Sequence, residues 1–127
     1  MNDLLVAGTA KTPLISFKVD QGLLEISGRS IPENSIEFYE SVYNWIEEYS
    51  KQPKPVTVIK IQLEYFNTSS SKCVLDIFRK LELLQKSGKS EVKVMWMYEE
   101  EDEDMMEAGD DYKAIVNLSF EIQQIKV

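Results

Sequence analysis

The chain has 127 residues, of which 43% are hydrophobic and 28% are charged, a balance typical of soluble globular proteins rather than disordered or membrane-spanning ones. Twenty-two acidic residues outweigh 14 basic ones and give a formal net charge of −8, which repels a phosphate backbone and excludes nucleic acid as an expected partner. The length predicts one domain over residues 1–127, large enough to bury a core without disulfides.

The single cysteine, Cys73, has no partner for an internal disulfide, and its place in a helical pattern predicts a small packing residue. Residues 1–6 lack the basic leader and the sustained apolar run of an export signal. No apolar stretch is long enough to span a bilayer. We therefore expect a cytoplasmic protein without a membrane partner.

Strand-like runs at residues 14–19 and 23–27 open the chain and flank a turn in which Gly22 can supply the positive φ of a hairpin. Residues 30–35 then carry helix-start chemistry, and apolar side chains recur at helical spacing until Pro53 and Pro55. The members of this stripe are Ile36, Tyr39, Val42, Tyr43, Ile46 and Tyr49. The pattern predicts a hairpin followed by a first helix.

The clearest strand pattern covers residues 58–66, where apolar and polar side chains alternate. Its predicted buried face consists of Ile59, Ile61, Leu63 and Tyr65. Beyond a cluster of hydroxyl residues, an apolar stripe at helical spacing runs until Gly88, which can cap a helix. The members of that stripe are Val74, Ile77, Phe78, Leu81 and Leu84. A second helix is therefore expected directly after this strand.

The last third of the chain predicts three further elements. Residues 92–98 alternate as a strand, and an unbroken acidic run follows at residues 99–104. Residues 105–114 indicate a short helix that Gly109 weakens, and residues 116–122 alternate as a final strand.

The resulting order, β-β-α-β-α-β-α-β, predicts an α/β fold with a mixed, mostly parallel sheet and helices packed on it, because helices between successive strands imply right-handed crossovers. The loops that leave the carboxyl ends of parallel strands share one edge of the sheet, where ligands and partners usually bind. Residues 30–35, 66–71 and 98–104 leave strands in this way. We therefore expect these three segments to form one continuous surface.

The most informative segment is Asn67-Thr68-Ser69-Ser70-Ser71-Lys72, a run of amide and hydroxyl side chains between a strand pattern and a helix pattern. Free N–H groups and the positive end of the helix dipole stabilise an anion at such a junction, so a phosphate there is physically supported. One residue is enough to cap a helix, whereas this junction holds five candidates, and Lys72 follows within reach of a phosphate. The residues alone distinguish neither capping from phosphorylation nor one hydroxyl from another.

Catalytic chemistry has little support in the sequence. The chain has no histidine, Cys73 has no neighbouring base, and no glycine-rich phosphate loop is present, so we expect no enzyme, no catalytic residue and no cofactor. The acidic run at residues 99–104 lacks the spaced ligands and central glycine of a calcium loop, which favours solvated charge over a metal site. A carboxylate-based metal enzyme is the weaker alternative, and no metal is expected.

Three motifs in this order resemble the SiaC family of bacterial regulatory phosphoproteins, over nearly the whole chain. They are Ile31-Pro32-Glu33-Asn34-Ser35, the run from Leu63 to Lys72 with its Asn67-Thr68-Ser69-Ser70 core, and the acidic segment that ends at residues 104–112. The asparagine-threonine-serine-serine motif is distinctive because it directly follows a strand pattern.

The resemblance implies a STAS-like fold, similar to anti-sigma-factor antagonists, with a phosphoacceptor at Thr68. It also implies a cognate kinase of histidine-kinase-like ATPase fold and a metal-dependent PPM-type phosphatase, which together set the phosphorylation state. The unphosphorylated form is expected to bind and activate a diguanylate cyclase, which links the switch to cyclic-di-GMP and biofilm formation. The residues expected to shape the partner site are Asn67, Ser69, Ser70 and Lys72, with Pro32, Glu33 and Asn34 as an adjoining surface.

The sequence therefore supports two hypotheses about function, which belong to different classes. In the first, reversible phosphorylation of Thr68 switches the binding of a partner, and the added dianion weakens that binding. In the second, the protein is a constitutive interaction scaffold, and Thr68 only caps its helix.

Overall fold

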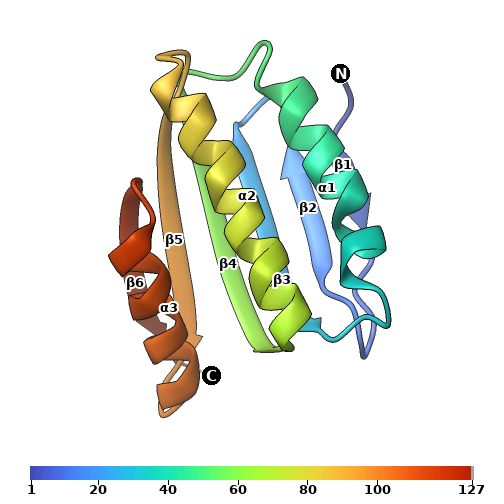
Figure 1. Cartoon of the computed structure of the whole chain (residues 1–127), viewed down its shortest axis with the longest axis vertical. Helices are drawn as coiled ribbons and strands as arrows, with labels where there is room; N and C mark the ends of the chain where they lie inside the picture. The colour runs from blue at the N-terminus through green and yellow to red at the C-terminus, as the bar shows by residue number, and fades with distance from the viewer. Residues whose placement is uncertain (127) are drawn as a thin grey trace.

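The computed structural model describes residues 1–126, which form six strands and three helices. The strands are β1 (Leu4–Val6), β2 (Leu14–Lys18), β3 (Leu23–Ser30), β4 (Val56–Phe66), β5 (Glu91–Glu99) and β6 (Ser119–Ile125), and the helices are α1 (Ser35–Tyr49), α2 (Thr68–Lys86) and α3 (Glu103–Ile115). All six strands lie in one sheet in the order β1-β2-β3-β4-β5-β6 (Figure 1).

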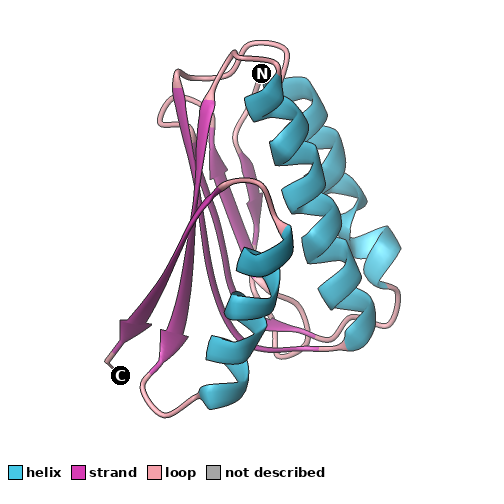
Figure 2. Ribbon diagram, turned by 60° about the vertical axis from the view of Figure 1, so that its left-hand side comes forward, coloured by secondary structure: helices cyan, strands magenta, loops and turns pink. Residues whose placement is uncertain are grey.

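The sheet is mixed, because β1, β2 and β3 pair antiparallel whereas β3, β4, β5 and β6 pair in parallel. A helix joins each parallel pair, and successive right-handed crossovers in one direction place all three helices on the same face of the sheet (Figure 2). This arrangement confirms the predicted α/β fold with helices packed on a mixed sheet. The expectation of a mostly parallel sheet is only partly right, since two of the five strand pairings are antiparallel.

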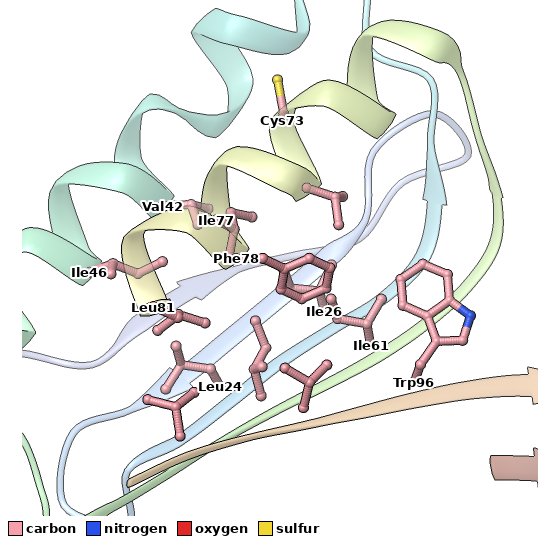
Figure 3. Packing of buried hydrophobic residues seen from close by; sticks show 14 of the residues in the cluster. Leu24, Ile26, Val42, Ile46, Ile61, Cys73, Ile77, Phe78, Leu81 and Trp96 are labelled. Carbon is pink, nitrogen blue, oxygen red and sulfur yellow. The ribbon is translucent and has the colours of Figure 1, made fainter. Parts of the chain in front are cut away.

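The hydrophobic core lies between the sheet and the helices. Phe78 of α2 lies over the sheet near Ile26 and Ile61, as Figure 3 shows. Its ring also meets Tyr112 of α3 and Phe120 of β6 edge-on, with ring centroids 5.2 and 5.6 Å apart. Burial of these large apolar side chains is the main stabilising contribution to the fold. Cys73, a free thiol, is buried among them as predicted.

Two side chains of the predicted apolar faces are exposed instead. Tyr65 is 51% exposed because the pairing of β3 with β4 shifts register between Gly28 and Arg29, so that Glu64 is an extra residue in β4 and the alternation is interrupted. Ile36 is 74% exposed, because Ser35 occupies the position four residues before Tyr39 on the buried face of α1. The predicted apolar faces of β4 and α1 were therefore each wrong at one position, and their other members are buried or half-buried.

The elements near the C-terminus also differ from their predicted bounds. α3 begins two residues earlier than the expected residue 105, and β6 covers Ser119–Ile125 instead of residues 116–122. Val116 is buried as the C-cap of α3, so its apolar character belongs to the end of the helix and not to the strand. Gly109 does not interrupt α3: a Cβ there would stand 2.5 Å from Cδ1 of Trp96, so glycine lets the helix approach the indole closely.

The structure adds one strand that the sequence did not predict. β1 has only three residues, too few for a periodic signal, and it extends the sheet by pairing antiparallel with β2. The observed order is therefore β-β-β-α-β-α-β-α-β. Among residues 1–126, none of the helices combines the length and the apolar character that a membrane crossing requires.

Candidate functional site

The three predicted surface segments meet at the carboxyl-terminal edge of the parallel strands, at the bottom of Figure 1. The segments after β3 and β4 are joined directly, because the backbone N–H of Asn67 donates to the carbonyl of Ser30 over 3.1 Å. The segment after β5 adjoins them, since Phe66, Asp102 and Asp104 line one hollow of about 230 Å³. The prediction of one continuous edge is therefore confirmed.

A chain of buried hydroxyl groups fastens the first turn of α2 to β3 and α1. Ser30 Oγ donates to Ser70 Oγ over 2.8 Å and is 2.7 Å from the hydroxyl of Tyr39, and the side chains of all three residues are fully buried. Ser35 Oγ lies 2.7 Å from Ser69 Oγ and 3.3 Å from Ser70 Oγ. We refer to Ser30, Ser35, Tyr39, Ser69 and Ser70 as the hydroxyl network. It holds the amino-terminal turns of α1 and α2 side by side.

Asparagine, not threonine, caps both of these helices. Asn67 Oδ1 accepts the backbone N–H of Ser70 over 2.9 Å at the start of α2, and Asn34 Oδ1 accepts the N–H of Glu37 over 3.1 Å at the start of α1. Thr68 is the first residue inside α2. The alternative hypothesis that Thr68 serves only as the helix cap is therefore wrong in its choice of cap, because Asn67 occupies that position.

The four hydroxyl residues of the cluster differ sharply in their surroundings. Ser70 is fully buried, Ser69 Oγ donates to Asn67 Oδ1 over 3.1 Å, and Ser71 Oγ lies 3.1 Å from the hydroxyl of Tyr112. Thr68 is exposed, and its hydroxyl has no hydrogen-bond partner among residues 1–126. Of the four, Thr68 alone therefore both is exposed to solvent and has a hydroxyl that forms no hydrogen bond within the described chain.

The surroundings of Thr68 favour negative charge. Within the described part of the chain, the backbone N–H groups of Thr68 and Ser69 have no acceptor, and they point out of the positive end of the α2 dipole. Lys72 is exposed and lies one turn further along α2, on the same side as Thr68. A phosphate on Thr68 would therefore have two backbone donors and one ammonium group within its neighbourhood.

The remaining residues of the predicted partner site lie on the same edge. Glu33 and Asn34 are exposed, and Pro32 is half-buried in the loop that leads from β3 into α1. Ser35 links this loop to the first turn of α2, because its hydroxyl is hydrogen-bonded to Ser69. The structure therefore brings Pro32, Glu33 and Asn34 next to the start of α2, but Ser70 lies beneath the surface and can contribute to a partner site only by holding the turn in place.

The acidic run has a structural role at the start of α3. Asp102 Oδ1 accepts the N–H of Met105 over 3.1 Å as the helix cap, and Glu103 and Asp104 lie in the first turn, where carboxylates complement the helix dipole. Among residues 1–126, no group of three histidine, cysteine or acidic side chains is arranged to hold a metal ion.

The hydroxyl network also couples stability to high pH. Burial raises the pKa of Tyr39 to about 12, and the hydrogen bond with Ser30 opposes this shift. The folded protein therefore retains the Tyr39 proton above pH 10, where the unfolded chain releases it, so stability is present below pH 10 and is lost as the pH rises towards 12. We expect this one group to account for a loss on the order of 2–3 kcal/mol over that interval.

Urea unfolding of the wild-type protein and Tyr39→Phe at pH 9 to 12 measures this effect. The variant should show a shallower fall in stability, although burial also raises the pKa of Tyr112 and leaves it some pH dependence. Parallel curves for the two proteins would show that Tyr39 does not contribute.

A family model described as "SiaC family regulatory phosphoprotein" matches residues 6–125. The chain belongs to the SiaC family. It is 32% identical over 123 residues, 97% of each chain, to an uncharacterised protein of Pseudomonas aeruginosa strain UCBPP-PA14.

Solved structures of this family share the fold throughout. SiaC of Pseudomonas aeruginosa is 31% identical and superimposes with a TM-score of 0.90 over 98% of this chain and 100% of that one. A chain in the crystal structure of the diguanylate cyclase SiaD in complex with its activator SiaC, from the same organism, is 32% identical and has a TM-score of 0.90 over 97% of this chain and 100% of that one. The predicted membership of the SiaC family is confirmed.

The sequence did not indicate that Tyr39 and Tyr112 belong to this site. Tyr39 fits an apolar helical stripe, and nothing in that stripe reveals that its hydroxyl reaches Ser30. Tyr112 donates to the carbonyl of Ser71 over 2.8 Å from a different helix. The one available signal was the serine at position 35, a polar residue at the position of the α1 stripe where an apolar one is expected.

Proposed function

We propose that this protein is a non-catalytic cytoplasmic signalling partner whose binding to a diguanylate cyclase is switched by reversible phosphorylation of Thr68. A cognate kinase adds the phosphate and a PPM-type phosphatase removes it. The observation that carries the proposal is the exposed, unbonded hydroxyl of Thr68 at the start of α2, in a chain that belongs to a family of regulatory phosphoproteins. The cyclase is proposed by likeness to SiaC, which activates SiaD.

The switch acts through local charge and hydration. In the unmodified protein, Thr68 and the exposed Asn34 present small uncharged polar groups that a partner can cover at modest desolvation cost. A phosphate adds ~−1.5 to −2 charge and a tightly held water shell at the same place. Because its own helix stabilises the phosphate, the modification weakens partner binding without unfolding α2.

The hydroxyl network supports a rigid switch. The first turn of α2 is held by Ser30 and Ser35 from two other elements, so the phosphate would stand at one defined position. A partner that fits the unmodified edge would collide with this phosphate. Loss of partner binding would therefore need no rearrangement of the fold.

Binding of the cyclase from the same cell to defined forms of the protein tests the proposal. We expect Thr68→Ala to bind as well as the unmodified protein, whereas the phosphorylated form and Thr68→Asp bind roughly tenfold more weakly or worse. Ser41→Asp is a matched control, because it adds the same charge at an exposed position in the middle of α1. It should bind normally.

Two outcomes would contradict the switch. Equal binding by Thr68→Ala and Thr68→Asp, together with equal binding by the phosphorylated form, would leave the constitutive scaffold as the better description. Intact-mass measurement on protein from its native cell should also show a fraction heavier by one phosphate, with the added mass mapped to Thr68. A phosphate mapped to Ser69 or Ser71 would show that Thr68 is not the acceptor.

A further inference from the structure

We propose that a groove between α2 and α3 is the docking site for a basic amphipathic helix of a partner protein. The groove has a volume of about 350 Å³, and Ser71 from the first turn of α2 contributes to its lining. We call it the α3 groove, and its lining residues are Phe66, Ser71, Leu75, Ala108, Asp111, Tyr112 and Ile115.

The groove exists because the helices are unevenly spaced on the sheet. α1 packs against α2, whereas α3 packs on β4, β5 and β6 and reaches α2 through Tyr112. The floor is largely apolar, and Ile115 at one end is 51% exposed. A concave surface with a mostly apolar lining is typical of a binding groove.

The shape of the groove favours a helix as its occupant. Its walls are formed by residues at helical spacing, with Ser71 and Leu75 on α2 and Ala108, Tyr112 and Ile115 on α3. The eight residues from Ala108 to Ile115 rise by roughly 10 Å, which is about two turns of helix. A helix lying along this length can place two apolar side chains, one turn apart, into the groove.

The charge of α3 selects a basic occupant. The helix carries five carboxylates and one lysine, and no ion pair is formed by any of the five within residues 1–126. The carboxylates are Glu103, Asp104, Glu107, Asp110 and Asp111. The neighbouring hollow, which shares Phe66 and Ala108 with the groove, adds Glu64 and Asp102. Lysine or arginine beside the apolar anchors would therefore be attracted, and acidic partners would be repelled.

This inference goes beyond the Thr68 switch and does not depend on it. Thr68 lies one turn before Ser71 on α2, so a phosphate would stand at one end of the groove. Its charge attracts a basic helix at long range, while its bulk and hydration occupy the end of the groove at short range. All measurements below use the unmodified protein, so that a failed groove and a failed switch give different results.

The test uses a synthetic peptide helix with leucine on one face and lysine on the other, labelled for fluorescence anisotropy. A second peptide has the same composition but a shuffled order, so that its leucines share no face. At about 0.15 M salt, where diffuse attraction is largely screened, we expect the amphipathic peptide to bind at least several-fold more tightly than the shuffled one.

Matched variants then locate the binding. Ile115→Gln should weaken binding roughly five- to tenfold, whereas Ile36→Gln, at an even more exposed isoleucine on α1, should leave it unchanged. Removal of two charges by Glu107→Gln with Asp111→Asn should weaken binding more than the same loss by Glu37→Gln with Glu40→Gln on α1. When the amphipathic peptide binds, the changes in amide chemical shift in NMR spectra should concentrate at residues 66–75 and 108–115.

Several results would overturn the proposal. Equal binding of both peptides, or equal effects of Ile115→Gln and Ile36→Gln, would mean that the attraction is only diffuse charge. Binding of neither peptide at this salt concentration, or amide shifts centred on α1 or on the open face of the sheet, would also exclude the α3 groove as the docking site.

Discussion

Replacing Ser70 by aspartate is expected to lower the free energy of unfolding by roughly 3–5 kcal/mol, because it places a carboxylate where no solvent reaches. Ser70 is 0% exposed, and its hydroxyl lies within hydrogen-bond distance of Ser30 and Ser35. Within residues 1–126, no basic side chain bonds to this network, so the carboxyl group must either remain unpaired or take up a proton. Urea unfolding followed by circular dichroism measures the loss.

Thr68→Asp is the matched control for this prediction, since it introduces the same group two residues earlier on the same helix. Thr68 is exposed at the positive end of α2, so the change should alter stability by less than ~1 kcal/mol and raise it slightly. The contrast bears on function, because a site of reversible phosphorylation must accept negative charge without unfolding. Similar losses of unfolding free energy for the two variants would contradict the prediction. They would show that positions 68 and 70 do not differ in their tolerance of a carboxylate.

Trp96→Ala is expected to cost roughly 3–5 kcal/mol and to loosen α3 more than the other helices. Trp96 is fully buried, donates its Nε1–H to the carbonyl of Met105 over 2.9 Å, and lies 5.3 Å from Tyr112 between ring centroids. Gly109 also sits against its indole. The α3 groove depends on this anchor, because Trp96 contacts α3 at Met105, Gly109 and Tyr112.

Hydrogen exchange combined with chemical unfolding separates the global and local effects. Amides of α3 should exchange faster in Trp96→Ala at a denaturant concentration where those of α1 and α2 remain protected. Trp96→Phe keeps an aromatic ring but loses the bond to Met105, so it should cost less, about 1–3 kcal/mol. Uniform exchange across all three helices of the alanine variant would mean that Trp96 holds the whole core and not α3 in particular.

Much of the fold followed from local patterns. The alternation in β4 and β5 and the apolar stripes of α1 and α2 were strong enough to predict the element order, apart from the three-residue β1. Errors arose where one residue changes the phase of a pattern. Glu64 is an extra residue in β4, which turns Tyr65 outward, and Val116 ends a helix instead of starting a strand. Neither event leaves a periodic signal, because each depends on a neighbouring strand or helix.

By itself, the sequence determined the class of fold, the family, and the placing of a hydroxyl cluster at the start of a helix, since these properties depend on residues close together in the chain. Only the tertiary structure decided which hydroxyl is free. Ser70 is buried by Ser30, 40 residues away, Ser71 lies against Tyr112, 41 residues away, and Asn67 takes the cap. Burial and hydrogen bonding between distant segments leave Thr68 open, and no local pattern contains that information.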